Sequence, residues 1–251
     1  MKKMNMEPQN KIQIFQTHEE LAEASVKFII ETAKKAIETS GRFVISLSGG
    51  HTPERLYTLL SKPPFRDQVQ WNKTFVFWGD ERCVPPDDKQ NNANMARTLL
   101  LDLIDIPPLN INAVPVELPP RKAANEYENT LKRFFGKEAP RFDIILLGLG
   151  ENGHTASLFP DAGIIFESHN WIMEVYVPEQ KMFRITMTPD LINQAHNIIF
   201  LVEGENKAAI LKTVLTADYQ PDKFPAQRIK PLNGNLYWFI DSKAAAHLSE
   251  K

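Results

Sequence analysis

The chain has 251 residues and a formal net charge of −2, with 43% hydrophobic and 24% charged residues. This composition is ordinary for a globular protein and is ample for a buried core. The near-neutral charge offers no electrostatic footprint for nucleic acid or an anionic membrane, so we expect neither as a partner. The single cysteine, Cys83, excludes an internal disulfide and a cysteine-based zinc site, and it fits a reducing compartment.

The beginning of the sequence does not predict a signal peptide. The stretch MKKMNMEPQNKIQ has two lysines but lacks the apolar core of a signal peptide. No apolar run along the chain approaches the roughly 20 residues that a membrane-spanning helix needs. We therefore expect a cytoplasmic protein.

A long helix followed by a strand is predicted near the N-terminus. Thr17 with Glu20 three residues later forms a capping box, and apolar residues then recur at helical spacing. Gly41 is the expected stop of this helix. Residues 42–47 come next and predict a strand.

The segment SGGHTP that follows this strand predicts an anion-binding turn. Thr52 is a natural N-cap and Pro53 suits the first position of a helix. Ser48, Gly49 and Gly50 come just before it, so free backbone amides would face an anion along a favourable helix dipole. The segment lacks the Gly-Lys-Ser/Thr ending of a P-loop, so a nucleotide triphosphate is not implied.

The rest of the chain alternates between predicted strands and helices. Two of these strands are separated by only a few residues and predict an antiparallel ribbon, which breaks the strict alternation of a β/α barrel. We expect an α/β fold with an open, mostly parallel sheet and helices on both faces, in a single domain covering residues 1–251. The predicted strands lie at residues 74–78, near Val114, and at 144–147, 171–177, 183–187, 197–202 and 235–240, with the ribbon formed by 171–177 and 183–187. The predicted helices are one that ends at Leu60, those at 92–104, 122–135, 205–215 and 244–248, and a short one opened by Thr188 and Pro189.

The stretch FDIILLGLGENGHTASLFP is the centre of the functional prediction. Its apolar run is short enough to be a strand buried on both faces. Gly148, Gly150 and Gly153 then allow a tight turn, and His154 follows at once. A helix after Gly153 has room for only about two turns before Pro160. A histidine on a turn at the carboxyl end of a buried strand occupies the position where open α/β sheets place their chemistry.

The same letters spell G-x-G-x-x-G, which raises the alternative of dinucleotide binding. A Rossmann fingerprint opens a full helix and usually lies in the first βαβ unit of the chain. Here the turn comes past the middle of the chain. Glu174, at the spacing of a ribose-binding acid, precedes a strand-like run and does not end one. The pattern therefore favours a site without a nicotinamide cofactor.

Five segments in this order resemble one known family. They are SGGHTP, GDERC, GLGENGHTASLFP, Arg184 in RITMTP and Lys207 in GENKA. Together they are similar to 6-phosphogluconolactonases, part of a larger group with glucosamine-6-phosphate deaminases and ribose-5-phosphate isomerases. The resemblance runs from about the first helix to Asp241.

The resemblance implies a fold and a reaction. The fold is a modified Rossmann-like three-layer α/β/α sandwich that uses no nucleotide. The reaction is hydrolysis of 6-phospho-D-glucono-1,5-lactone to 6-phosphogluconate in the oxidative pentose phosphate pathway. Neither a metal nor any other cofactor is implied, and we expect a monomer or a weak homo-oligomer.

Site residues follow from matching the motifs. His154 matches the family's proposed acid–base, and an imidazole can deprotonate water and then protonate the leaving ring oxygen. Amides of the 148–153 turn or Arg82 would stabilise the oxyanion. The remaining substrate-binding candidates hold the phosphate or lie in the turns, and two acidic residues are further catalytic candidates. The full set is His154, Asp80 and Glu81 as catalytic residues, and Ser48, Gly49, Gly50, Thr52, Arg82, Asn152, Gly153, Arg184 and Lys207 as substrate-binding residues.

The chain departs from the family pattern at a few positions. Asn152 stands where the family usually has Asp before Gly-His, which keeps the shape of the side chain but removes its charge. His51 replaces a small or hydroxyl residue, and Asn91 with Asn92 replaces Ser-Asn. The other histidines, including His18, are interpreted as surface or structural residues.

Two alternative functions are compatible with the sequence. An amino-sugar phosphate deaminase of the same fold would resemble Asp-Glu-Tyr where this chain has Asp80-Glu81-Arg82. A non-catalytic sugar-phosphate sensor would carry a DNA-binding domain, for which the sequence shows no basic extra segment.

Overall fold

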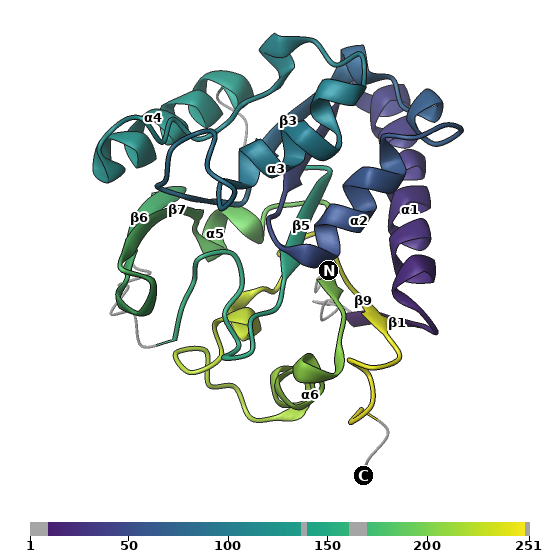
Figure 1. Ribbon diagram of the computed structural model, residues 1–251, viewed down its shortest axis with the longest axis vertical. Helices are drawn as coiled ribbons and strands as arrows, with labels where there is room; N and C mark the ends of the chain where they lie inside the picture. The colour runs from purple at the N-terminus through teal and green to yellow at the C-terminus, as the bar shows by residue number, and fades with distance from the viewer. Residues whose placement is uncertain (1–9, 137–139, 161–169, 249–251) are drawn as a thin grey trace, which may run out of the picture.

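The computed structural model describes residues 10–136, 140–160 and 170–248, and a six-stranded sheet lies at its centre (Figure 1). The strand order is β1-β9-β8-β5-β2-β3, and all neighbouring pairs are parallel. Since parallel strands need crossover connections, the helices between them are placed on the faces of the sheet. The six strands are β1 (Asn10–Phe15), β2 (Phe43–Leu47), β3 (Thr74–Trp78), β5 (Ile144–Gly148), β8 (Asn197–Val202) and β9 (Asn235–Asp241).

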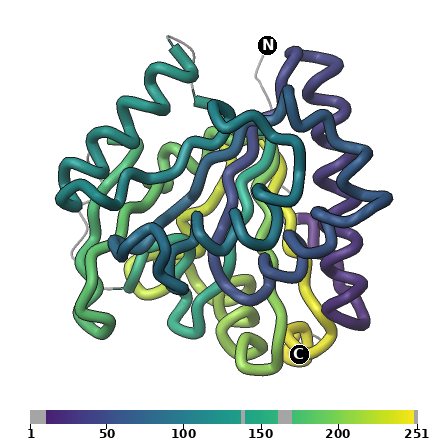
Figure 2. The backbone as a smooth tube through the Cα atoms, turned by 45° about the horizontal axis from the view of Figure 1, so that its top comes forward, coloured from purple at the N-terminus to yellow at the C-terminus, as the bar shows by residue number. Residues whose placement is uncertain are grey.

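Helices cover both faces because alternate side chains of each strand point in opposite directions. In β5, Ile144 and Leu146 join one apolar core, whereas Ile145 and Leu147 join the other. Figure 2 shows the purple α1 and the teal α4 on opposite sides of the strands. The first core packs against α1 (His18–Ser40), α2 (His51–Leu60) and α3 (Asn92–Leu99), and the second against α4 (Pro120–Phe135), α5 (Pro189–Ile192) and α6 (Ala208–Thr216).

A small antiparallel sheet continues from the edge of the large one. β4 (Asp80–Arg82) follows β3 after a single glycine and pairs with β7 (Met182–Met187), which in turn pairs with β6 (Ile172–Val177). The carboxylate of Glu128 on α4 accepts hydrogen bonds from the backbone N–H groups of Trp171 and Ile172 at 2.9 and 3.1 Å. The predicted α/β class, with a mostly parallel sheet and an antiparallel ribbon, is confirmed, and the ribbon gains a third strand.

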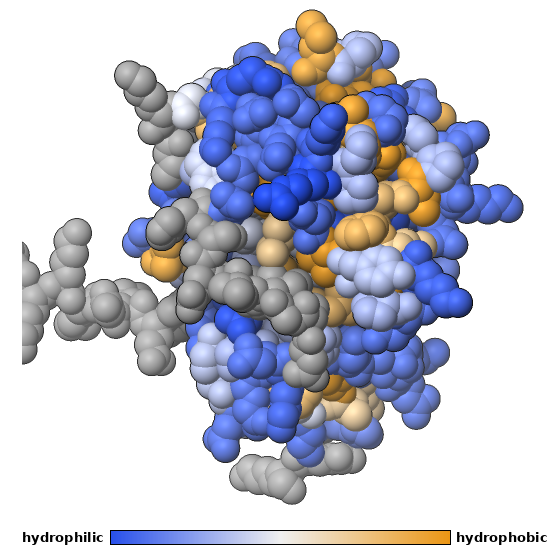
Figure 3. Space-filling view, turned by 90° about the vertical axis from the view of Figure 1, so that its left-hand side faces the viewer, coloured by the Kyte–Doolittle hydropathy of each residue, from blue (hydrophilic) through white to orange (hydrophobic). Residues whose placement is uncertain are grey.

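The surface of the described residues is mainly hydrophilic on the side that carries α4 and the small sheet (Figure 3). Among all described residues, a few large apolar side chains are exposed, with Leu109 at 92% and Leu232 at 64% the most open. None of the described helices combines the length and the apolar character needed to cross a bilayer.

Most predicted elements are present with small shifts of their ends. Thr17 caps α1 by accepting from the N–H of Glu20 at 3.1 Å, and Gly41 ends the helix at φ 78°. Thr188 caps α5 in the same way, with the N–H of Leu191 as donor. The predicted helix 92–104 stops earlier, because Leu100 leaves helical geometry at φ −141° and a 3-10 turn follows.

Several predictions of local structure are wrong. Thr52 is not the N-cap of α2, because the helix begins two residues earlier than predicted, at His51, and its N-cap is Gly50 with φ 103°. No strand forms at Val114, since the only pairing there is an isolated bridge between Val76 and Ile111. The predicted C-terminal helix at 244–248 is a series of turns.

The short helix expected after Gly153 is also absent. The N–H of Gly150 bonds to the carbonyl of His154 at 2.8 Å, and Thr155 pairs with Leu158 in a bridge. Ala156 has φ 46°, in the left-handed region that interrupts a helix. This segment is therefore a compact loop that presents His154.

Candidate active site

A pocket of about 570 Å³ lies at the edge of the large sheet where the parallel strands end. The turns after β2, β5 and β8 and the strand β4 contribute side chains to it. This is the edge at which open parallel sheets bind ligands. Nine of the predicted site residues line the pocket, namely Ser48, Gly49, Gly50, Thr52, Asp80, Arg82, His154, Arg184 and Lys207.

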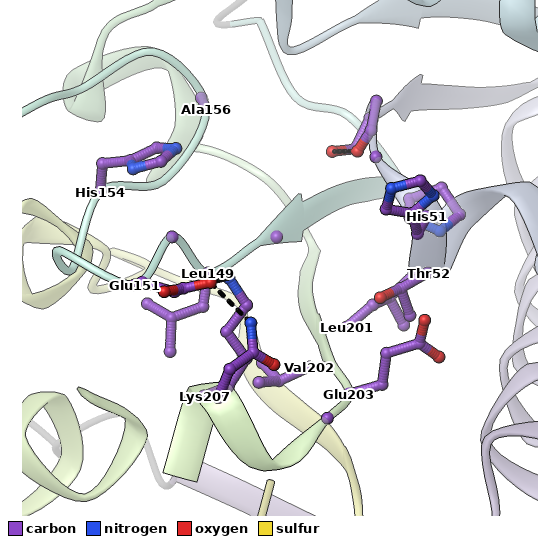
Figure 4. A pocket seen from close by; sticks show the side chains of 18 of the residues that line it. His51, Thr52, Leu149, Glu151, His154, Ala156, Leu201, Val202, Glu203 and Lys207 are labelled. Carbon is purple, nitrogen blue, oxygen red and sulfur yellow. Dashed lines mark hydrogen bonds and ion pairs between the residues drawn. The ribbon is translucent and has the colours of Figure 1, made fainter. Parts of the chain in front are cut away.

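Two walls of the pocket face each other (Figure 4). His154 and Ala156 lie on one side, and His51 and Thr52 lie on the other, at the N-terminus of α2. Amides in the first turn of an α-helix have no acceptor within the helix, so this wall offers N–H donors to an anion. His51 is almost fully exposed, with a side-chain exposure of 93%.

Gly49 and Gly150 allow close packing at the floor of the pocket. A Cβ atom on Gly49 would lie 1.9 Å from Oδ1 of Asn92, and a Cβ atom on Gly150 would lie 2.0 Å from Nδ1 of His154. The amide of Asn92 donates to the carbonyl of Asp80 at 2.9 Å. Both glycines are therefore required by neighbouring side chains that belong to the pocket.

Asn152 holds the imidazole of His154. Its Oδ1 atom lies 2.6 Å from Nδ1 of His154 and also accepts from the backbone N–H of His154 at 3.2 Å. Since the backbone bond requires an acceptor at that position, Nδ1 must carry the ring hydrogen in this contact. Nε2 of the neutral ring is then left with its lone pair. Asn152 itself is not among the residues that line the pocket, and its side chain contacts His154.

The ring of His154 stacks on Phe159, with centroids 4.3 Å apart and an interplanar angle of 23°. Burial lowers the pKa of His154 to about 4. The positive charges of Arg184, Lys207 and Arg82 act in the same direction, whereas Asp80 opposes them. His154 is therefore a neutral base at neutral pH.

Asp80 is held in a buried network with two partners. Ser157 donates its hydroxyl to Oδ2 of Asp80 at 2.6 Å, and Nη1 of Arg184 lies 3.6 Å from the same oxygen. Gln180 accepts from Nη2 of Arg184, and the guanidinium lies 5.4 Å from the ring centroid of Phe159. Asp80 and Arg184 are only 7% and 6% exposed. Their burial and their contacts hold one negative and one positive side chain in fixed positions beside the pocket.

Two further cations border the pocket. Arg82 donates from Nη1 to the carbonyl of Gln90 at 2.7 Å, while its Nε–H is buried without an acceptor in the described part of the chain. Lys207 lies 3.9 Å from Glu151, which also accepts from Asn206 at 2.6 Å. Burial lowers the pKa of Lys207, and Glu151 partly offsets that effect.

Glu81 is not brought to the pocket, so its predicted catalytic role does not fit its position. It is fully buried, and its carboxylate accepts hydrogen bonds from the N–H groups of Arg82, Asn92 and Ala93 at 2.8, 2.7 and 2.8 Å. Burial raises the pKa of Glu81 to about 7, while these donors act to lower it. Glu81 anchors the N-terminus of α3, where acidic groups are favoured by the helix dipole.

Two amides of the 148–153 turn are unavailable to an oxyanion. The N–H of Gly150 bonds to the carbonyl of His154, and the N–H of Gly153 bonds to the carbonyl of Gly150 at 2.9 Å. Gly153 is buried beneath Phe224 and adopts φ 83°, so it shapes the turn and does not line the pocket.

Several pocket residues were not predicted from the sequence. His18, interpreted as a surface residue, lines the pocket from the start of α1. Glu203 and Asp241 line it from the ends of β8 and β9. Glu203 directly follows the apolar strand β8, and Asp241 is the last residue of β9. Acidic residues at the carboxyl ends of two apolar strands are the signal that could have identified both. Among the described residues, no group of three or more His, Cys, Asp or Glu side chains could hold a metal ion.

These features define an α/β protein whose cation-lined pocket, with a neutral histidine, suits a small anionic molecule. The chain belongs to the family of glucosamine-6-phosphate isomerases/6-phosphogluconolactonases, whose family model matches residues 16–238. The match runs from just before α1 into β9 and includes the ends of β2, β5 and β8 that contribute to the pocket.

Curated relatives and solved structures agree with this membership. A 6-phosphogluconolactonase of Synechocystis sp. is 40% identical over 91% of this chain and 94% of its own. One of Haemophilus influenzae is 41% identical over 81% of this chain and 86% of its own. The structure of 6-phosphogluconolactonase from Trypanosoma cruzi superimposes with a TM-score of 0.85 at 30% identity, covering 98% of this chain and 100% of that one.

Proposed function

We propose that this protein hydrolyses 6-phospho-D-glucono-1,5-lactone to 6-phosphogluconate, as an enzyme of the oxidative pentose phosphate pathway. The relatives named as 6-phosphogluconolactonases support this substrate. The observation that carries the chemistry is the neutral imidazole of His154, fixed by Asn152 at the edge of a pocket whose lining includes Arg82, Arg184 and Lys207.

His154 acts as the general base in this proposal. Nε2 takes a proton from a water molecule, whose oxygen attacks the lactone carbonyl carbon and forms a tetrahedral oxyanion. Because its pKa is lowered, His154 is unprotonated before the substrate arrives and needs no activation step. The stack on Phe159 and the bond to Asn152 fix the ring plane during this transfer.

The same imidazole then completes the reaction as an acid. The tetrahedral intermediate collapses, the bond between the carbonyl carbon and the ring oxygen breaks, and Nε2 returns its proton to that oxygen as a hydroxyl. Since Gly150 and Gly153 already use their amides, the oxyanion is assigned to Arg82.

The substrate phosphate would bind to the basic side chains and the turn after β2. Arg184 offers a forked donor, while Lys207 provides a point charge. Ser48, Gly49, Gly50 and Thr52 lie at the opposite wall, with the amides of the helix start. The phosphate also adds negative charge near His154 and offsets part of the effect of the cations on its pKa.

The broader properties of the enzyme are proposed with it. The reaction needs no metal, because an imidazole and cationic donors supply both proton transfer and charge stabilisation. The protein acts in the cytoplasm as a single domain, either as a monomer or as a weak homo-oligomer.

Loss of the lactone at neutral pH, measured against the uncatalysed background, tests the proposal. The wild-type protein should accelerate hydrolysis equally with and without a chelator. His154→Ala should lower the enzymatic rate by about 100- to 10,000-fold, the range for a general acid–base. Equal rates for the variant and the wild type would falsify the role of His154, and ammonia release from glucosamine 6-phosphate would favour the deaminase.

A further inference from the structure

Tyr57 joins α2 to the strand end that carries the glycine turn. Its side chain is 1% exposed, and its hydroxyl donates to the carbonyl of Ser48 at 2.7 Å while accepting from the N–H of Ser48 at 3.0 Å. Ser48 is the first residue after β2, where the chain leaves the sheet. One phenol therefore satisfies both backbone groups of the residue from which the pocket wall begins.

Tyr127 makes the same contact at the neighbouring strand. It lies on α4, on the opposite face of the sheet, and is also 1% exposed. Its hydroxyl accepts from the N–H of Trp78 at 2.7 Å and donates to the carbonyl of Trp78 at 2.9 Å. Trp78 is the last residue of β3 and precedes Asp80 by two positions. The N–H of Gly79, between them, bonds to the carbonyl of Leu47 at 3.0 Å.

The chemistry of the phenol explains why tyrosine occupies these two positions. A hydroxyl can donate and accept through a single atom, so it matches an N–H and a C=O on the same residue. Burial raises the pKa of both Tyr57 and Tyr127, so each keeps the proton that it donates. Without the hydroxyls, the N–H and C=O groups of Ser48 and Trp78 would be buried without these partners, which is costly.

We infer that Tyr57 and Tyr127 are positioning residues that hold the two strand ends carrying the Ser48–Gly50 and Asp80–Arg82 segments in register with the pocket. This inference rests on the proposed function. The two hydroxyls act from opposite layers of the fold, so the two halves of the pocket are fixed independently.

Removing one hydroxyl at a time tests the inference. Tyr57→Phe and Tyr127→Phe keep the ring and its packing, whereas Tyr237→Phe is the matched control. Among the residues that the structure describes, the hydroxyl of Tyr237 has a single hydrogen bond, which it accepts at 3.4 Å from Nζ of Lys11 at the far edge of the sheet. Steady-state kinetics and the dissociation constant of 6-phosphogluconate are compared across the three variants.

Tyr57→Phe should raise KM and the product dissociation constant by about 5- to 50-fold, the effect of leaving buried backbone groups unpaired, with kcat changed by less than about 3-fold. Tyr127→Phe should displace Asp80, which normally raises the pKa of His154, and should therefore also shift the acid limb of the pH profile downward. Tyr237→Phe should match the wild type. Unchanged KM in Tyr57→Phe together with an unchanged pH profile in Tyr127→Phe would overturn the inference.

Backbone hydrogen exchange gives a readout that needs no turnover. In the wild type, the amides of Ser48 and Trp78 should be protected like the central strands, and each Phe variant should lose protection at its own strand end. Fast exchange of both amides in the wild type would also overturn the inference, even if a variant failed to fold. If the wild-type protein did not hydrolyse the lactone but showed this protection, the proposed function would be rejected. The role of Tyr57 and Tyr127 in holding the two strand ends would still stand.

Discussion

Oδ1 of Asn152 lies 2.6 Å from Nδ1 of His154 and fixes the tautomer of the imidazole without contributing a charge. In the family to which the resemblance pointed, this position usually holds a carboxylate. An amide oxygen accepts the same hydrogen bond with the same geometry, so orientation is retained. The difference is electrostatic, because a neutral amide does not stabilise the imidazolium form as a carboxylate does.

Asn152→Asp should therefore raise the pKa of His154. An opposite charge at this distance shifts a pKa by about 1–3 units toward the charged form. His154 works as a base when unprotonated, so the acid limb of kcat/KM should move to higher pH in the variant. In the wild type, with the pKa lowered to about 4, this limb should lie well below neutral pH. NMR titration of the imidazole measures both values, and a pKa that stays in place would contradict the assigned contact.

Gly150→Ala should displace the catalytic ring. The new Cβ atom would lie 2.0 Å from Nδ1 of His154, so the imidazole must move. A displacement of about 1 Å in a catalytic group costs about 100-fold in rate, and kcat should fall by roughly that amount. Gly79→Ala is the control, since its Cβ atom would meet nothing closer than Ser46 Oγ at 3.5 Å. Equal losses in both variants would show that the effect is not specific to His154.

Ser157→Ala should lower stability. Its hydroxyl donates at 2.6 Å to the carboxylate of Asp80 in a fully buried position, and alanine cannot supply that donor. We expect a loss of about 1–3 kcal/mol in the free energy of unfolding, measured by urea denaturation. Ser242→Ala also removes one hydroxyl hydrogen bond, at 2.8 Å to Gln16, but at an exposed site. That control should change the same free energy by less than about 0.5 kcal/mol.

Lys207→Met should weaken substrate binding. The side chain is half-buried at the pocket, and methionine retains its apolar stem while removing the charge. Loss of a hydrogen bond to a charged group costs about 1.5–3 kcal/mol, which predicts a rise in KM of about 10- to 150-fold. Lys223→Met, at an exposed position outside the pocket, should leave KM unchanged. A rise in KM in Lys207→Met, with kcat unchanged and with no rise in Lys223→Met, would support a role of Lys207 in substrate binding. A loss of kcat alone would contradict that role.

The local sequence was sufficient to predict most of the helices and strands. The caps at Thr17 and Gly41, the buried run of β5 and the ribbon of β6 and β7 depend on nearest neighbours along the chain, so the sequence predicts them. β1 was missed because it is an edge strand with Ile12 and Ile14 exposed, and its partner β9 is distant in sequence. The prediction of Thr52 as N-cap was wrong because the helix starts two residues earlier, after Gly50 at φ 103°.

The sequence by itself determined that a histidine follows a glycine turn at the end of a buried strand, and that basic residues follow other strands. Only the tertiary structure decided that Ser157 bonds to Asp80, that Asn152 holds the ring of His154, and that Glu81 anchors α3 outside the pocket. The physical reason is one of range. Turns and caps follow from backbone energies within a few residues, whereas these contacts depend on how the sheet brings strand ends together and on which polar groups remain to be satisfied once they are buried.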